Sequence, residues 1–459
     1  ISDEEVEQMS FYRPPDDAPE VAYLQECRTA LGGHLPVRRL KGDSLTIPPL
    51  TVFERLLQDT GEREISTTQA IVQAMTLLCR DKNIGQRIVP IVPDEARTFG
   101  MEGMFRQIGI YAHEGQKYEP VDREQLMYYK ENQSGQLLQE GITEDGAMSS
   151  WIAAATAYTN TGMQMIPFYI FYSMFGFQRI GDLIWAAGDM QARGFLIGAT
   201  SGRTTLNGEG LQHEDGHSQI MAGNVPNCVS YDPTFAYELM VILHDGMQRM
   251  FKKQENVFYY ITTMNENYSH PGLSKVQKKD IVKGMYLFQK AKKGKTRVQL
   301  LGSGAILREV IAAAVLLEKD FNVQADIWSC PSFNELKRDG DEVSRWNLLH
   351  PDKKARQCHV TQCLESTEGP VVAATDYVKL FADQIRAYVP KSYAVLGTDG
   401  FGRSDSREAL RKHFEVDRYY ITVVALNSLV GEGAISVKTV KSALKKYGID
   451  SEKNNPLLS

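Results

Sequence analysis

The chain has 459 residues, which is enough for two or three domains with buried cores. Its hydrophobic fraction of 42% and charged fraction of 24% are those of an ordinary globular protein. A net charge of −6 argues against nucleic acid as a partner, because phosphate binding requires a basic surface. No apolar run reaches transmembrane length, so no membrane partner is expected. The six cysteines form no C-x-x-C pair, which favours reduced thiols and a cytoplasmic location.

The first fifty residues are predicted to be an appendage rather than a domain. An acidic start is followed by Pro14-Pro15, a short helical pattern near 21–31, and Gly32-Gly33, which ends that helix. The segment has too little apolar surface for a core of its own. Because the chain begins at Ile1 without a methionine, we expect a fragment or a processed product.

From about residue 50 to 273, strand-sized apolar runs alternate with helical patterns. The predicted strands are, in chain order, 87–92, 165–172, 195–199, 227–231 and 257–262. The predicted helices are 66–80, with Ser66 as its cap, one ending near 158, 178–194 and 234–252. This alternation predicts βαβ units around a parallel sheet. The stretch 113–135 has no periodicity, which indicates either disorder or a functional loop.

Residues 274–459 repeat the same pattern on a smaller scale. A lysine-rich segment over 275–293 is predicted to be a solvated surface and linker. Strands are predicted at 297–301, 325–330, 370–374 and 393–396, and a helix at 305–318. Gly302-Ser303-Gly304 lacks the spacing of a phosphate-binding turn and predicts a tight turn instead. The fold class is therefore α/β, with two consecutive parallel-sheet domains.

The stretch 204–217 (TTLNGEGLQHEDGH) concentrates titratable groups on a glycine-rich backbone, as active sites do. It contains the H-E-x-x-H pattern of zinc proteases, from His213 to His217. However, a glycine such as Gly216 costs about 1 kcal/mol relative to alanine in a helix interior. A zinc helix is therefore disfavoured. A solvated polar loop is the simpler alternative, and an active-site loop without a metal is favoured.

Three other motifs have a structural explanation beside a functional one. Asp94 and Glu95 follow a strand, where ligands bind in open parallel sheets, but acidic residues there also cap helices. Glu144 opens a helix, where the helix dipole favours glutamate in any case. The aromatic residues of 172–177 either complete a core or form a stacking platform for a flat heterocycle.

Five stretches together resemble one family. They are PDEARTFGMEGMFRQIG at 93–109, QEGITE at 139–144, PFYIFYSMFGFQRIGD at 167–182, residues 200–217, and LGTDGFGRSDSR at 396–407. They resemble the C-terminal half of the bacterial homodimeric pyruvate dehydrogenases. The resemblance implies a transketolase-like thiamine-diphosphate-binding fold. It also implies three parts: a connector from a missing N-terminal domain at 1–43, a pyrimidine-binding domain at 44–273, and a C-terminal domain at 274–459.

The resemblance assigns cofactor-binding roles to five residues. Glu144 matches the glutamate that contacts the aminopyrimidine ring of thiamine diphosphate, and this contact is also part of catalysis. Phe175 matches the residue that stacks on that ring, and Ile142 matches one that holds the bent cofactor. Asp94 and Glu95 match acidic residues near the cofactor.

The resemblance also implies an activity, namely oxidative decarboxylation of pyruvate with acetyl transfer to the lipoyl group of the acetyltransferase component of the pyruvate dehydrogenase complex. Tyr172, Glu209 and His213 match catalytic positions that face the substrate, and Glu95 is a further catalytic candidate. The loop at 114–130 matches a mobile active-site loop of the family.

The family's G-D-G…N motif, which binds diphosphate and magnesium, is absent from this sequence. Thiamine diphosphate and Mg²⁺ are the implied cofactors, but the Mg²⁺ ligands are expected outside this chain. The implied partners are a second copy of the chain in a homodimer with shared active sites, the missing diphosphate-binding half, and the lipoyl-bearing acetyltransferase component. Two alternatives remain: another thiamine enzyme, such as a transketolase or a different 2-oxo acid dehydrogenase, or a non-catalytic scaffold fragment.

Overall fold

The structure is a computed structural model that describes residues 2–33, 39–93, 96–119, 121, 129–273 and 278–459. Its residues form two compact units, one of 1–43 with 157–163 and one of 44–156 with 164–459. The smaller unit contains helices α1 (Asp3–Glu7) and α2 (Pro19–Ala30), in which no residue is buried. The helix predicted near 21–31 is thus confirmed. It begins at Pro19 because proline suits the first helical position, where the backbone N–H has no partner in the helix.

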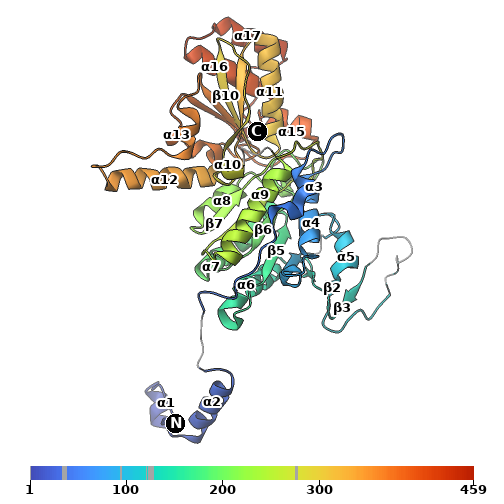
Figure 1. The fold of residues 1–459 in the computed structure, drawn as a ribbon, viewed down its shortest axis with the longest axis vertical. Coiled ribbons are helices and arrows are strands. Elements are labelled where there is room, and N and C mark those ends of the chain that lie inside the picture. Colours follow the sequence, from blue (N-terminus) through green and yellow to red (C-terminus); the bar gives the residue numbers. More distant parts are fainter. Residues whose placement is uncertain (1, 34–38, 94–95, 120, 122–128, 274–277) are drawn as a thin grey trace. The chain divides into compact units, whose positions relative to one another are not determined.

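The larger unit contains a six-stranded sheet, the first sheet, in the order β4-β1-β5-β6-β8-β7 (Figure 1). Its strands are β1 (Ile88–Val92), β4 (Leu138–Gln139), β5 (Ile166–Phe171), β6 (Phe195–Gly198), β7 (Cys228–Tyr231) and β8 (Phe258–Thr262). Every pairing in this sheet is parallel, so all its strands end along one edge. All residues of β5 are buried, which explains its uninterrupted apolar sequence.

Helices connect these strands as the sequence predicts. The α-helices of this region are α3 (Glu54–Leu57), α4 (Thr67–Leu78), α5 (Glu102–Ile108), α6 (Glu144–Thr161), α7 (Ser173–Asp189), α8 (Ser218–Asn224), α9 (Ala236–Met247) and α10 (Lys278–Val282). A small two-stranded sheet pairs β2 (Ile110–Tyr111) with β3 (Glu131–Asn132). Ser66 caps α4 by accepting a hydrogen bond from Gln69 N, as predicted.

The prediction for α7 is wrong at its start. The helix begins at Ser173, five residues before the predicted start at 178, because the aromatic residues after β5 are also compatible with a buried strand. Phe175 therefore lies in the first turn of a helix, directly beyond the end of β5.

The second sheet has the order β13-β12-β10-β11-β9. Its strands are β9 (Tyr286–Gln289), β10 (Arg297–Gly302), β11 (Gln324–Ser329), β12 (Val371–Ala374) and β13 (Tyr393–Leu396). Four strands are parallel, as predicted, whereas β9 pairs antiparallel with β11 at the edge. The prediction of a linker over 275–293 is wrong for β9, because the flanking lysines Lys283 and Lys290 mask a short apolar strand.

Side chains of the second sheet alternate between two cores. Leu300 and Ile327 belong to the core that continues from the first sheet, while Leu301 and Trp328 belong to a separate one. Both faces are therefore covered. The helices are α11 (Ile306–Phe321), α12 (Phe333–Leu349), α13 (His359–Leu364), α14 (Leu380–Asp383), α15 (Arg407–His413), α16 (Arg418–Gly431) and α17 (Val437–Lys446).

The two sheet regions are joined by polar side chains at their strand ends. Asp232, which follows β7, accepts a hydrogen bond from Ser303 Oγ at 2.9 Å, and Gly304 N donates to the Asp232 carbonyl at 3.1 Å. Gly304 has a positive φ of 49°, and a Cβ there would overlap the Asp232 carboxylate. The predicted tight turn is confirmed, and its glycine is required by the approach of a carboxylate from the first sheet.

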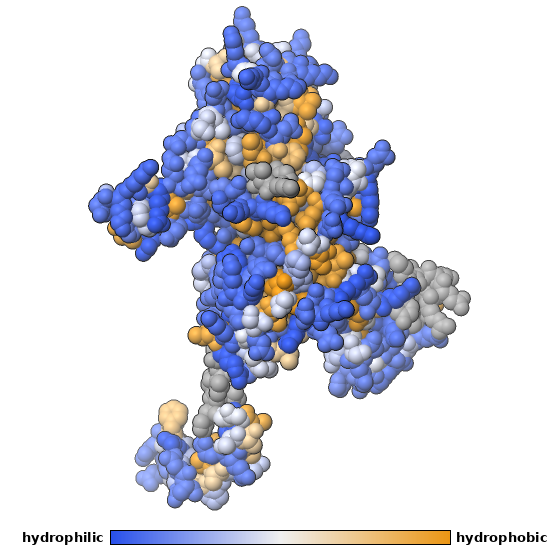
Figure 2. Space-filling view, in the orientation of Figure 1, coloured by the Kyte–Doolittle hydropathy of each residue, from blue (hydrophilic) through white to orange (hydrophobic). Residues whose placement is uncertain are grey.

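Each of the six cysteines is a free thiol. Among the described residues, no helix is long and apolar enough to cross a membrane. Figure 2 shows a largely hydrophilic face that is interrupted by an apolar area. Because large apolar areas on a protein surface mark contact sites, this face is a candidate for association.

Candidate active site

The candidate residues lie where strands of the first sheet end. Glu144 begins α6 after β4, Tyr172 follows β5, and His213 lies in the glycine-rich loop after β6. Because these strands are parallel members of one sheet, their carboxyl ends lie along the same edge. Open parallel sheets bind their ligands at that edge.

His213 packs between two aromatic rings. Its ring centroid lies 4.9 Å from that of Tyr172 and 5.1 Å from that of Phe175. Its Nδ1 is buried and has no hydrogen-bond partner among the described residues, while Glu209 Oε2 lies 3.7 Å away. The two rings hold this imidazole in one orientation, and histidine is a common proton-transfer group in active sites.

Glu144 and Phe175 are linked through Arg179, which the sequence did not single out. Nη1 of Arg179 lies 2.7 Å from Glu144 Oε1, and its guanidinium carbon lies 4.1 Å from the centre of the Phe175 ring. The Glu144 side chain is only 13% exposed, whereas that of Arg179 is 50% exposed. Arg179 follows Phe175 by four residues in α7, and this spacing places both side chains on one helix face.

The H-E-x-x-H segment is not an α-helix. Residues Leu211–His213 form a single 3₁₀ turn, and Glu214 has an extended backbone with φ −81° and ψ 96°. Asp215 Oδ1 accepts hydrogen bonds from the backbone N of His217 and of Ser218, both at 2.9 Å, at the start of α8. The backbone therefore agrees with the prediction of a glycine-rich loop rather than a zinc helix.

Comparison with known proteins identifies the family. The profile of the pyruvate dehydrogenase E1 component middle domain matches residues 47–271, and that of the transketolase-like C-terminal domain matches 284–417. The pyruvate dehydrogenase E1 components of Pseudomonas aeruginosa and Cupriavidus necator are 59% and 58% identical to this chain. These alignments cover 100% of the chain and 52% and 51% of the respective relatives.

The chain belongs to the pyruvate dehydrogenase E1 component family. It spans about half the length of the curated relatives it matches. Transketolase from Leishmania mexicana shares the fold, with a TM-score of 0.60 and 15% identity over 83% of this chain and 48% of that one. The resemblance found in the sequence and the transketolase-like α/β fold are both confirmed.

The site of this E1-family chain suits a flat, ring-containing cofactor. The Phe175 ring already carries a planar cation on its face, which shows that the face accepts a flat group. Glu144 supplies a largely buried carboxylate beside it. A flat ring with an N–H donor at its edge, such as the aminopyrimidine of thiamine diphosphate, matches this pair.

The structure does not bring every predicted site residue of this E1-family chain to the candidate site. Asp94 and Glu95 lie outside the described residues, as does the centre of the loop at 114–130. Ile142 is described and is 78% exposed, on the connection between β4 and α6. Its side chain is therefore accessible to a partner or a ligand.

Burial raises the pKa of two carboxyls, one in the glycine-rich loop and one bonded to it. Desolvation raises the pKa of Glu214 to about 9, and the nearby Asp376 carboxylate acts in the same direction. Burial likewise raises the pKa of Asp376 to about 6, although hydrogen bonds from Thr204 oppose the shift. Burial therefore favours the neutral form of Glu214 at pH 7.

Proposed function

We propose that this chain is the part of a pyruvate dehydrogenase E1 component that supplies the aminopyrimidine side of a thiamine-diphosphate site. The whole protein then decarboxylates pyruvate oxidatively and transfers the acetyl group to the lipoyl group of the acetyltransferase component of the pyruvate dehydrogenase complex. The observation that carries the proposal is the convergence of Glu144, Phe175 and His213 at one sheet edge, in a chain with E1-component relatives.

Glu144 and Phe175 are the residues that would hold the cofactor ring. Glu144, in the first turn of α6, accepts a hydrogen bond from the ring edge. Phe175 provides the stacking face. Bound thiamine diphosphate supplies an electron sink for decarboxylation of a 2-oxo acid.

His213 and Glu209 are proposed to handle the proton on the substrate side. The two rings around His213 hold its imidazole in one orientation, while Nδ1 remains available within 3.7 Å of Glu209 Oε2. Histidine is suited to this role because its pKa in water lies near neutrality. Tyr172 packs on His213 and excludes water from one face of its ring.

The missing half of the site is proposed to come from other polypeptide. Large apolar side chains near the glycine-rich loop are exposed: Leu211 by 53%, Ile142 by 78% and Phe401 by 81%. Exposed apolar side chains that lie together are typical of surfaces that contact another protein. A homodimer, a diphosphate-binding half with the Mg²⁺ ligands, and the lipoyl-bearing acetyltransferase component are the proposed partners. We also propose that the protein is cytoplasmic. Its two domains in this chain are proposed to span 44–273 and 274–459.

The test uses the intact protein that contains this chain. Release of carbon dioxide from pyruvate is measured with thiamine diphosphate, Mg²⁺ and an artificial electron acceptor, and then reductive acetylation of a lipoyl domain. Other 2-oxo acids and ketose phosphates serve as competing substrates. Pyruvate should be turned over with the highest kcat/KM. A preference for a ketose phosphate or a branched 2-oxo acid would assign the chain to a different thiamine enzyme.

A further inference from the structure

The glycine-rich loop at 200–217 consists of two buried limbs and an accessible tip. Residues 200–206 and 214–216 are buried, whereas no residue of 207–213 is. The tip carries Glu209 and His213. Apart from one 3₁₀ turn, the loop has no regular secondary structure to fix the tip. The contacts of its limbs therefore decide where these two side chains lie.

The first limb is bonded to Asp376, which follows β12 of the second sheet. Thr204 N donates to both oxygens of the Asp376 carboxylate, at 3.1 and 3.2 Å, and Thr204 Oγ1 donates at 2.7 Å. Asp376 is buried, so water cannot replace these bonds. A buried carboxylate that accepts three hydrogen bonds from one residue holds that residue in one place.

Arg203 joins both limbs to the end of β13. Its Nη1 donates to the carbonyl of Thr398 at 2.9 Å and to that of Gly400. The same guanidinium lies against Gly216, where a Cβ would overlap it. The second limb is also bonded directly, since Val378 N donates to the Gly216 carbonyl at 2.8 Å. We call these contacts of Asp376, Arg203 and Val378 with the two limbs the clamp. The close approach of Arg203 within the clamp explains the glycine at 216.

The backbone of the tip is held on both sides of Glu209. Gly208 N donates to the Asp405 carbonyl at 3.0 Å. On the other side, a Cβ at Gly402 would overlap the Leu211 carbonyl, so the two backbones are in direct contact. Asp405 and Gly402 both belong to the stretch matched by the transketolase-like C-terminal domain.

Helix α15 also bonds to the first limb of the loop, residues 200–206. Arg407 Nε donates to the Thr205 carbonyl at 2.7 Å, and Arg411 Nε donates to Thr204 Oγ1 at 3.3 Å. Both arginines thus act on consecutive residues of the loop. Neither contact needs a ligand or a second chain.

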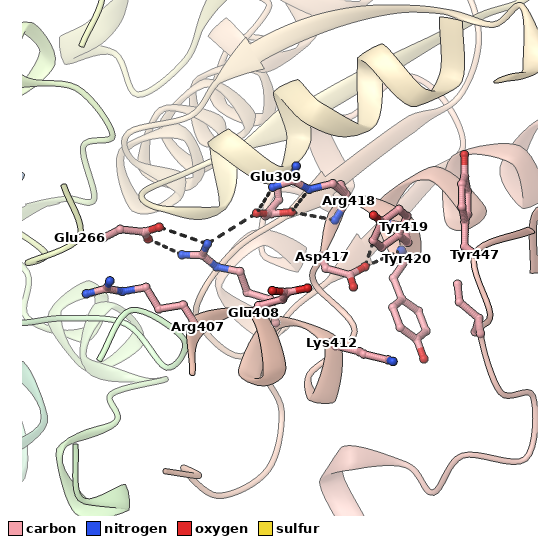
Figure 3. Close-up of a pocket in the computed structure, with 12 residues that line it drawn as sticks. Glu266, Glu309, Arg407, Glu408, Lys412, Asp417, Arg418, Tyr419, Tyr420 and Tyr447 are labelled. Carbon is pink, nitrogen blue, oxygen red and sulfur yellow. Dashed lines mark hydrogen bonds and ion pairs between the residues drawn. The ribbon is translucent and has the colours of Figure 1, made fainter. Parts of the chain in front are cut away.

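Arg411 is itself fixed in a row of ion pairs, of which Glu266, Glu309 and Arg418 are labelled in Figure 3. Glu266, beyond β8, pairs with Arg411, which lies 3.5 Å from Glu309, and Glu309 lies 2.9 Å from Arg418. The row lines a cavity of about 470 Å³. Both carboxylates of the row, Glu266 and Glu309, are already paired with arginines. We therefore interpret the row as an ion network between the two sheet regions rather than as a site for a charged ligand.

We propose that the C-terminal domain, matched at 284–417, positions the catalytic loop, and that Asp376 of that domain and Arg203 of the loop are the positioning residues. They act on the reaction through the loop and touch neither substrate nor cofactor. The inference rests on the proposed function for what the loop does. Its contacts come from this structure alone. The second sheet, which carries none of the candidate catalytic residues, thereby takes part in catalysis.

The test compares two buried carboxylates of the second sheet in the intact protein. Asp376→Asn and Thr204→Val weaken the clamp. The control is Asp326→Asn, because Asp326 is also buried and lies in the same domain but does not contact the loop. It accepts hydrogen bonds from Ala291 N at 2.8 Å and from Gln299 Nε2 at 3.1 Å, and it pairs with Lys290 and Arg297. Steady-state kinetics with pyruvate and hydrogen exchange of peptides spanning 200–217 are measured for each variant.

The clamp variants should lower kcat about 10- to 100-fold, because small displacements of a catalytic group are costly, while KM changes less than about 3-fold. Exchange at 204–214 should rise in both. The control should keep kcat within about 2-fold and leave exchange of the loop unchanged. Equal losses of kcat in Asp376→Asn and Asp326→Asn, or unchanged loop exchange in Asp376→Asn, would overturn the proposal. Exchange needs no turnover, so it decides the matter even if the proposed function fails.

Discussion

At the scale of single residues, the environment of His213 separates it from the other histidine of the H-E-x-x-H pattern. His213 lies between Tyr172 and Phe175, and its buried Nδ1 has no bonded partner among the described residues. His217 instead lies at the start of α8, with Nε2 2.7 Å from Gln178 Nε2. The two histidines, four positions apart, therefore lie in different environments.

We expect His213→Ala in the intact protein to lower kcat about 10²- to 10⁴-fold, the usual range for loss of a proton-transfer group. Cofactor affinity, measured by calorimetry, should change little, because the proposed cofactor contacts are Glu144 and Phe175. His217→Ala is the matched control and should keep most of the activity. A large loss of cofactor affinity in His213→Ala would show that the residue is structural.

Glu144→Ala is expected to abolish cofactor activation, measured as exchange of the C2 proton of bound thiamine diphosphate in the intact protein. The carboxylate is largely buried beside Phe175 and is proposed to bond the cofactor ring. Asp145→Ala is the control, since Asp145 is exposed in the same first turn of α6 and shares its helix dipole. Near-normal exchange in Glu144→Ala would refute the role.

Glu214 makes stability depend on pH. Its folded pKa of about 9 exceeds the value of 4.5 for an unperturbed glutamate, so the folded state binds the proton more tightly. Stability is therefore lost as pH rises from about 4.5 to 9, by at most about 1.4 kcal/mol per pH unit. Glu214→Gln should lose less thermal stability than the wild type between pH 6 and pH 8.5. If the unfolding midpoints of the wild type and of Glu214→Gln depended on pH in the same way, the raised pKa of Glu214 would be contradicted.

At the scale of elements, glycines in the loop serve the packing of backbone against side chains. Gly202 has a φ of 88°, and a Cβ there would overlap Asp376 Oδ2. Gly181 lies in α7, directly after a kink at Ile180, and an added Cβ there would have no neighbouring atom within 4 Å. The same residue type is therefore obligatory in the loop and replaceable in the helix.

We expect Gly202→Ala to destabilise the protein by about 1–3 kcal/mol and to reduce activity, since strain and overlap both act at that position. Gly181→Ala should instead raise stability by up to about 1 kcal/mol, the helix preference of alanine over glycine. Chemical denaturation of both variants provides the comparison. A neutral Gly202→Ala would mean that the loop has room to rearrange.

At the scale of the whole molecule, the proposed function gives this chain half of a cofactor site. It spans about half the length of its curated relatives, and Ile142 and Leu211 are exposed near the proposed cofactor contacts. In this proposal, the remaining contacts come from polypeptide outside this chain. An incomplete site binds weakly, because the lost contacts no longer offset the entropy of association.

Calorimetry with thiamine diphosphate and Mg²⁺ should therefore detect much weaker binding to this chain alone than to the intact protein. Adding the separately produced missing half should restore tight binding. The intact protein carrying Phe175→Ala is a second reference, because it has every domain but lacks the stacking face. Tight binding to the isolated chain would contradict the half-site proposal.

The sequence predicted most of the strands correctly, and it supplied the proposed site residues. Runs such as 166–171 are buried on both faces of a parallel sheet, so their apolar character is visible without a fold. Glu144 and His213 were found because they lie in long stretches shared with one family. β9 and the start of α7 were missed, since a strand of four residues between lysines and an aromatic helix start have no distinctive period.

Tertiary structure alone decided which residues support the candidate site. Arg179 links Glu144 to Phe175, and Asp376 holds Thr204 from 172 positions away in the chain. The bond between Asp376 and Thr204 has no local sequence signal, because it depends on how the two sheets present their strand ends to each other. Of the Arg179 contacts, only the four-residue spacing to Phe175 is visible in the sequence. The sequence therefore determined which groups are available, and the packing of the second sheet against the loop determined where they are held.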